Sequence, residues 1–448
     1  MPRAAGGPFD PFRHEREDGL ATLERVVKQP WFGDSIVLAG PSYLGYVQWA
    51  VADQLPPEVK AMIPQITTSA LTLEFLREDG FSLETPFGWG TMVADQERPF
   101  PLVRRVLQGR KDQRALTTLP LNRADTAAIG RSYDYVQDIL VHHGPDAERW
   151  AGIDHRHRVA QVNVPVSSIA GWYDIFLPGQ LDDFRSLQEA GRTARLTVGP
   201  WTHLKGDNTA MNEALEFGLA HARGEEPPHR APVRLFVMGE EAWRDFDSWP
   251  PVGYAPRRFH LQPGGALAEE PPAESAPDTY HYDPMNPTPA VGGVRMVSDS
   301  GRVDNAKLEA RPDVLTYTTP TLDQDVEVIG EVSAEIFFRS SLPYADVFVR
   351  LCDVDPKGRS VNVCDGLVSL TGANETTRAT VTLWATAHRF KRGHHIRVQV
   401  SSGAFPRYAR NPGTGEPHAT ATTLVAADQT VLHDPEHPSA IILPVRRA

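Results

Sequence analysis

The stretch SIVLAGPSYLG, residues 35–45, predicts a buried strand, a tight turn and the start of a helix. Ser35–Ala39 is a short apolar run of the kind that forms a buried strand. Leu44–Leu55 follows as a helical pattern that ends before two prolines. Ser42 stands at the turn between them. Strand, serine and helix in this order are typical of a nucleophile elbow, in which a sharp turn lifts the serine hydroxyl clear of the backbone.

Two later segments place an aspartate and a histidine at the same kind of position. Gly171-Trp172-Tyr173-Asp174 follows the apolar run Val166–Ala170, and Gly199-Pro200-Trp201-Thr202-His203 follows Ala194–Val198. Open α/β sheets carry their chemistry at the carboxyl ends of strands. The order Ser, Asp, His is also the one by which the α/β-hydrolase fold builds its catalytic triad.

Serine hydrolysis requires all three of these side chains. A serine hydroxyl is a weak nucleophile, so an imidazole must take its proton and a carboxylate must orient that imidazole. We therefore expect Ser42 to be the nucleophile, His203 the general base and then acid, and Asp174 the orienting carboxylate. The backbone N–H of Tyr43, at the helix N-terminus, would stabilise the oxyanion. Taken singly, each motif is more often structural, and Leu44 replaces the second glycine of the commonest elbow pattern.

The motifs resemble those of the cocaine-esterase and X-prolyl dipeptidyl-peptidase family of serine hydrolases (CocE/NonD type). The segments that carry the resemblance are Gly40–Trp49, Gly171–Asp174 and Gly199–His203, with weaker matches that extend it over nearly the whole chain. The resemblance implies an α/β-hydrolase domain, a helical cap inserted after the strand that follows the elbow helix, and a C-terminal jelly-roll β-sandwich of galactose-binding-like type.

We accordingly expect four segments along the chain. Residues 1–70 would form the first part of the α/β-hydrolase, 71–156 the helical cap, 157–250 the second part of the hydrolase, and 251–448 the jelly roll. From about residue 251 onward the pattern changes to short β-branched runs separated by turn residues, which is typical of a sandwich or barrel.

The start of the chain departs from the family pattern. Only 41 residues precede Ser42, whereas the family places several strands there and draws a second oxyanion donor, a tyrosine hydroxyl, from them. No tyrosine precedes Tyr43. We therefore expect the N-terminal strands to be missing, the elbow strand to keep an unpaired edge that promotes aggregation, and residues 251–448 to fold alone. This leaves open the alternative of an impaired remnant that serves as a binding module.

The residues that follow the triad aspartate indicate which class of substrate the chain accepts. Family members that act on α-amino esters carry carboxylates there, whereas this chain has the apolar residues 175–177. The resemblance assigns Phe176 to substrate binding, although it could equally be a core residue. We expect a neutral or hydrophobic ester, with amide substrates, X-Pro dipeptidyl-peptidase activity and acylase activity as alternatives.

Composition indicates the setting. A net charge of −12 and a pI near 5.7 argue against nucleic acid or an anionic membrane as a partner. There is no long apolar run and no apolar signal-like segment, so a cytoplasmic location is expected. We expect no cofactor and no metal site, since His142-His143 and Asp154–His157 lack ligand spacing. We expect Cys352 and Cys364 to be buried thiols that form no disulfide, and Asp182-Asp183 to face solvent. The sequence leaves open whether the chain forms a homo-oligomer.

Overall fold

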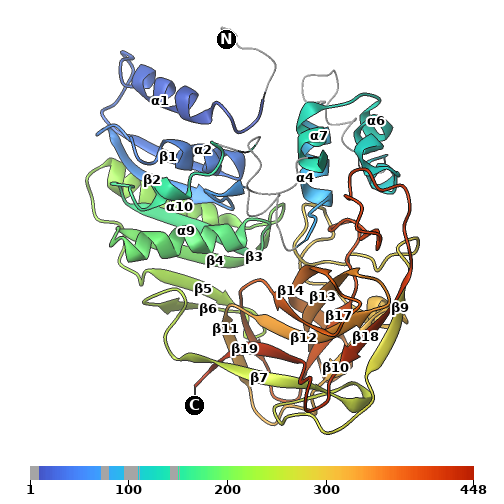
Figure 1. Ribbon diagram of the computed structural model, residues 1–448. Coiled ribbons are helices and arrows are strands. Elements are labelled where there is room, and N and C mark those ends of the chain that lie inside the picture. The colour runs from blue at the N-terminus through green and yellow to red at the C-terminus, as the bar shows by residue number, and fades with distance from the viewer. Residues whose placement is uncertain are drawn as a thin grey trace.

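The computed structural model describes residues 10–71, 80–94, 109, 111–141, 150 and 152–447. Figure 1 shows a six-stranded sheet with its helices on one side of the molecule and a large β region on the other. A group of helices lies above the β region. This arrangement is an α/β-hydrolase fold followed by a C-terminal β-rich region.

The first sheet has the strand order β1-β2-β3-β4-β5-β6. The first five strands run parallel and β6 is antiparallel to β5. β3 is buried along its whole length, as its apolar sequence predicts for a parallel strand covered on both faces. The strands are β1 (Ile36–Pro41), β2 (Val59–Gln65), β3 (Val166–Tyr173), β4 (Ala194–Thr202), β5 (Val233–Val237) and β6 (Ala242–Phe246).

Helices cover both faces of this sheet. On one face α1, α2 and α9 pack on the strands through a cluster that includes Leu23, Trp49 and Leu187. On the other face α10 packs through Ala214 and Phe217. The helices are α1 (Glu15–Val26), α2 (Tyr43–Val51), α8 (Arg156–Val159), α9 (Leu177–Glu189) and α10 (Asn208–Ala222).

A helical segment lies between β2 and β3, where the cap is expected. Its helices pack on one another through Tyr135, Val136 and Ile139 of α7. They are α4 (Glu84–Ala94), the short 3₁₀ helix η1 (Leu121–Arg123), α6 (Ala124–Ile129) and α7 (Asp134–Val141). We refer to residues 80–141, as far as they are described, as the helical segment.

The C-terminal β region contains a second network of thirteen paired strands among the described residues. These are β7 (Tyr254–Gln262), β8 (Ala266–Ala268), β9 (Asp278–Tyr282), β10 (Leu315–Thr318), β11 (Val326–Gly330), β12 (Ser333–Ser340), β13 (Tyr344–Val354), β14 (Ser360–Thr371), β15 (Thr377–Thr382), β16 (Thr386–Phe390), β17 (His395–Ser401), β18 (Ala427–Leu432) and β19 (Ala440–Arg446). The short helices η3 (Pro263–Gly265) and α11 (Ala306–Glu309) interrupt them.

A tight turn at Asp355–Gly358 joins β13 to β14 as a hairpin and closes with a hydrogen bond from Gly358 N–H to Asp355 O. Cys352 and Cys364 lie on these two paired strands, and both are buried free thiols. Burial raises the pKa of Cys352 to about 12, so its thiol stays protonated.

The sequence pattern also predicts residues 234–238 as the last strand of the first sheet and 326–338 as one β-branched run, and both predictions are wrong in detail. β6 follows the first of these runs and pairs with it antiparallel. The second run consists of β11 and the start of β12, separated at Glu331-Val332. Asp183 does not face solvent: its residue is 3% exposed, whereas the side chain of Asp182 is 49% exposed.

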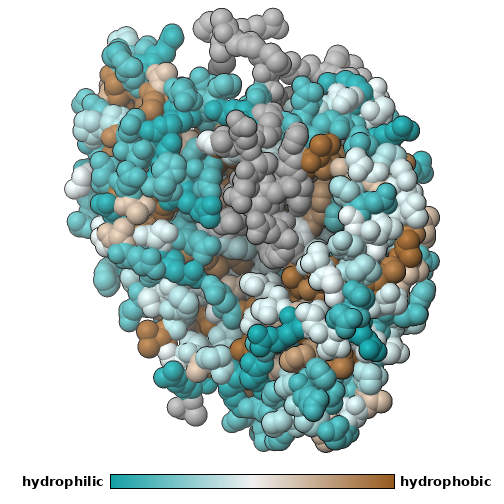
Figure 2. Space-filling model, viewed as in Figure 1, coloured by the Kyte–Doolittle hydropathy of each residue, from teal (hydrophilic) through white to brown (hydrophobic). Residues whose placement is uncertain are grey.

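The face shown in Figure 2 is mainly hydrophilic, with apolar side chains scattered over it. Among the helices that the structure describes, none combines the length and the apolar character needed to cross a membrane.

Candidate active site

The turn between β1 and α2 holds Ser42 in a strained conformation. Its φ is 55° and its ψ is −123°, a left-handed region that non-glycine residues rarely occupy and that is frequent at functional sites. Two hydrogen bonds fix the turn: Ser42 N–H donates to Gln65 O (2.9 Å), and the Thr67 hydroxyl donates to Ser42 O (2.8 Å). Glycine is required at position 40, because a Cβ there would lie 2.6 Å from the Cβ of Leu44.

Asp174 and His203 lie at the ends of neighbouring parallel strands, next to Ser42. His203 Nε2 is 3.0 Å from Ser42 Oγ, and His203 Nδ1 is 2.7 Å from Asp174 Oδ2. Asp174 is fully buried, and its other oxygen accepts a hydrogen bond from Phe176 N–H at 2.8 Å. The structure therefore brings the three residues singled out in the sequence into one hydrogen-bonded chain, with the imidazole in the middle.

Tyr43 is the first residue of α2, so its N–H belongs to the turn that has no intrahelical acceptor. This N–H lies directly after Ser42, where an oxyanion donor is expected. The phenol of Tyr43 points elsewhere: it donates to Glu15 and accepts from Phe12 N–H at 3.1 Å. Burial, and then the bond to Glu15, raise the pKa of the Tyr43 phenol, so the phenol is neutral.

A pocket opens beside Ser42 and His203 and is lined mainly by aromatic and aliphatic side chains. Phe176 is part of this wall, with its ring edge-on to the His203 ring at a centroid distance of 5.4 Å. Tyr43 and Trp89 also line the pocket, and their rings are stacked with 6.1 Å between centroids. None of the described residues that line the pocket is acidic or basic apart from His203.

Sequence reasoning missed several of these lining residues. Phe12, Trp89 and Met296 lie far apart in the chain and carry no motif that would mark them. Phe12 is the least expected, because it precedes α1 yet is 6% exposed and packs on Tyr43 and Trp89. Only the tertiary fold brings them to the site.

Of the residues considered for a metal, Asp154–His157 belong to no cluster of ligands in the described part of the chain. Among the described residues, no group of three or more His, Cys, Asp or Glu side chains is arranged to hold an ion. His155 is buried against the ring of Tyr46, and burial lowers its pKa to about 4. His142-His143 lie outside the described residues.

Two protein-family models match the chain. Residues 3–205 match X-Pro dipeptidyl-peptidase (S15 family), and residues 229–442 match the X-Pro dipeptidyl-peptidase C-terminal non-catalytic domain. The chain is 32% identical to cocaine esterase of Rhodococcus sp. (strain MB1 Bresler) over 500 residues, which cover 99% of this chain and 86% of that protein.

Solved structures share the fold. The chain is similar to a selenomethionine-labelled α-amino acid ester hydrolase, with a TM-score of 0.82 and 21% identity over 98% of this chain and 81% of that one. It is also similar to an aminopeptidase from a marine sediment archaeon, Thaumarchaeota archaeon, with a TM-score of 0.79 and 21% identity over 99% and 82% of the two chains.

Proposed function

Because the chain belongs to the cocaine-esterase and X-Pro dipeptidyl-peptidase (S15) family and is a serine hydrolase, we propose that it cleaves carboxylic esters through an acyl-enzyme on Ser42. The observation that carries this proposal is the hydrogen-bonded chain from Ser42 Oγ through the His203 ring to Asp174. An imidazole held in this way can take the serine proton as the hydroxyl attacks.

The proposed reaction has two halves. Ser42 Oγ attacks the ester carbonyl, its proton passes to His203 Nε2, and the Tyr43 N–H stabilises the oxyanion. The C–O bond to the alcohol then breaks, and His203 returns its proton to the leaving oxygen. A water molecule, deprotonated by the same nitrogen, attacks the acyl-enzyme and releases the carboxylic acid and free Ser42. Asp174 stabilises the imidazolium in both halves.

The pocket supports a neutral, apolar substrate. Ile175 and Phe176 lie in its wall, where a carboxylate would be needed to bind a substrate ammonium. The name of the first relative, cocaine esterase, is that of an ester hydrolase. Peptides with a free N-terminus and α-amino esters would place their ammonium group against an apolar wall. This would cost binding free energy, because the charge would lose water without gaining a partner. The pocket therefore favours ester hydrolysis over X-Pro peptidase and acylase activities.

A direct test uses Ser42→Ala with p-nitrophenyl esters and a fluorophosphonate probe. The wild-type protein should turn over the esters faster than Ala-Pro-p-nitroanilide and become labelled at Ser42. Ser42→Ala should lose both properties, and Asp174→Asn should lose turnover on the order of 10⁴-fold because the wrong imidazole tautomer results. Chelators should change nothing.

Retained turnover in Ser42→Ala, or labelling at another residue, would refute the mechanism. A wild-type protein that is neither active nor labelled would instead favour the alternative of a binding module.

A further inference from the structure

A buried ion pair joins the helical segment to the C-terminal β region, next in the chain to residues that line the pocket. Glu84 begins α4, and Arg295 lies in the loop between β9 and α11. The Arg295 guanidinium donates two hydrogen bonds to the Glu84 carboxylate, from Nε to Oε2 and from Nη2 to Oε1, each 2.7 Å long. Both residues are almost fully buried, at 5% and 6% exposure. The pair links positions 211 residues apart in the chain.

The chain neighbours of both partners line the pocket. Thr85 follows Glu84, and Trp89 lies one helical turn further along the same helix. Met296 follows Arg295 and is the pocket residue that the C-terminal β region supplies. A two-pronged arginine–carboxylate contact fixes orientation as well as distance. The pair therefore sets how far the α4 side of the pocket stands from Met296.

Arg295 keeps its charge although it is buried. Burial lowers the pKa of Arg295, but hydrogen bonds and charge attraction from Glu84 outweigh it, so the net pKa is raised. Gln113 adds a third hydrogen bond, from Nε2 to Glu84 Oε1 at 2.9 Å.

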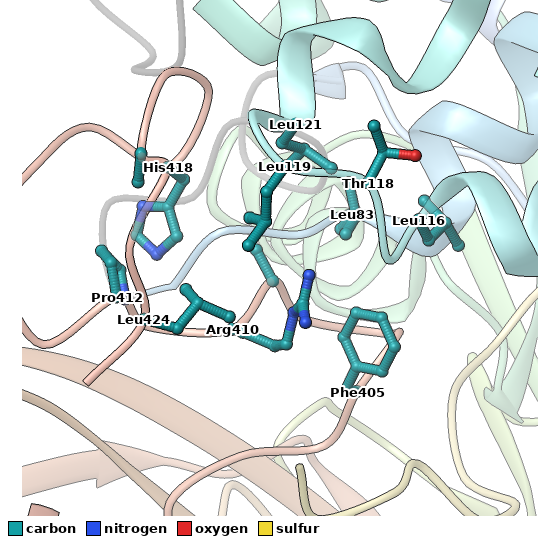
Figure 3. A pocket seen from close by; sticks show the side chains of 12 residues that line it. Leu83, Leu116, Thr118, Leu119, Leu121, Phe405, Arg410, Pro412, His418 and Leu424 are labelled. Carbon is teal, nitrogen blue, oxygen red and sulfur yellow. The ribbon is translucent and has the colours of Figure 1, made fainter. Parts of the chain in front are cut away.

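The junction has other contacts that hold it without the ion pair. Leu83 N–H donates to Arg407 O and Ala409 N–H donates to Phe81 O, both at 2.9 Å. Figure 3 shows the hollow at this junction, with Leu83 and Leu121 of the helical segment facing Phe405 and Arg410 of the C-terminal β region. These backbone bonds anchor the start of α4 to residues 407–409, whereas the ion pair ties the loop that carries Met296 to the same point. Loosening the pair should therefore free Met296 from α4 and leave the junction itself in place.

We propose that Glu84 and Arg295 are positioning residues that fix the width of the substrate pocket and thereby select esters by the bulk of their acyl group. The proposal rests on the proposed ester hydrolysis. A loosened pair would let α4 and Met296 move apart, so large acyl groups would be held poorly while small ones, which do not touch this wall, would react as before.

The test uses Glu84→Gln and Arg295→Lys with p-nitrophenyl acetate, butyrate and benzoate. Arg295→Lys keeps both buried charges. Glu84→Gln keeps a hydrogen-bonding oxygen but leaves the Arg295 guanidinium, among the described residues, with only the Asp299 carboxylate at 3.5 Å, so thermal melts check that this variant folds. We expect acetate turnover to stay within about threefold and the kcat/KM for benzoate to fall by roughly 10- to 100-fold through a higher KM, because small misplacements of a binding wall cost this much. Met296→Ala should lower the benzoate-to-acetate ratio in the same direction.

The matched control is Arg230→Lys, since the side chains of the Arg230–Glu213 pair are comparably buried but none of their chain neighbours lines the pocket. An unchanged benzoate-to-acetate ratio in both Glu84→Gln and Arg295→Lys, or an equal change in the control, would overturn the proposal. The effects of the two changes should also be less than additive in the double variant, because each one breaks the same contact.

A second measurement separates this proposal from the proposed function. In the Ser42→Ala background, the dissociation constant for p-nitrophenyl benzoate is measured with and without Glu84→Gln. Weakened binding of roughly tenfold supports the role of the pair even if the chain proves catalytically silent. Unchanged binding refutes that role even if the wild-type protein hydrolyses esters by way of Ser42.

Discussion

At the scale of single residues, Asp183 has an energetic cost that depends on pH. Its carboxylate is buried on α9 and accepts hydrogen bonds from the hydroxyl and the backbone N–H of Ser69. Burial raises the pKa of Asp183 to about 7, more than these bonds lower it. An unfolded aspartate ionises near pH 4, so between about pH 4 and pH 7 unfolding releases a proton and the free energy of unfolding falls as pH rises.

We therefore predict that Asp183→Asn is more stable than the wild-type protein at pH 8, and that the difference shrinks towards pH 4. The upper limit is about 1.4 kcal/mol for each unit of pKa shift. Urea unfolding at both pH values measures it. Asp245→Asn is the control of opposite sign, because the Arg234 hydrogen bonds lower the pKa of Asp245 and its removal should cost stability at pH 8. An Asp183→Asn protein less stable at pH 8 than at pH 4, relative to wild type, would contradict the argument.

Which residues could be found from the sequence depends on how local their signal is. Ser42, Asp174 and His203 each follow a strand within a short motif, so their meeting could be predicted. The burial of Asp183 could not, because it depends on Ser69, a residue more than a hundred positions away on the loop after β2. A charged pair on a helix usually faces solvent.

At the scale of elements, the close packing of α2 against the loop after β2 holds the nucleophile. A Cβ on Gly45 would lie 2.4 Å from Cγ2 of Thr67 and 2.7 Å from its Cβ. Gly45→Ala should therefore push α2 outward, misplace Ser42 and lower ester turnover by roughly 10- to 100-fold. Steady-state kinetics and thermal melts on the same samples measure the effect.

Thr67→Ser should partly rescue this variant. It removes the methyl group that clashes and keeps the hydroxyl that bonds Ser42 O. Gly88→Ala is the control, because a Cβ there meets no atom within 4 Å. If Gly45→Ala were as active as Gly88→Ala, the packing argument would be wrong.

Elements with a strong apolar pattern were predictable, and pairing-dependent ones were not. The strands β1, β3 and β4 and the helix α2 lie close to where the sequence places them. β16 (TAHRF) has a mixed composition and is a strand because it pairs with β11 along its whole length. β6 likewise depends on its hairpin with β5. Such strands are specified by their partners rather than by their own residues.

At the scale of the whole molecule, the strand that carries the nucleophile lies at an edge. Within the described residues β1 pairs with β2 on one side only, and Val37 and Leu38 are partly exposed. The helix α10, which packs on β1 and β2, presents Met211, Leu215 and Leu219 to solvent at 57%, 53% and 48% exposure. An open apolar edge of this kind is a template for pairing with another chain.

We predict that the 448-residue chain self-associates through this region in a concentration-dependent way. Leu215→Glu with Leu219→Lys should reduce the association, because charges on the exposed face oppose the burial of apolar surface that drives it. Light scattering coupled to size-exclusion chromatography measures the mass.

Val252→Glu is the control, since Val252 is 92% exposed but lies outside this region. A monomeric wild-type chain at all concentrations, or equal dispersal by the control, would show that the edge is protected by some other means. Since β1 also positions Ser42, any pairing along its free edge should change ester turnover with protein concentration, and the double variant should weaken that dependence.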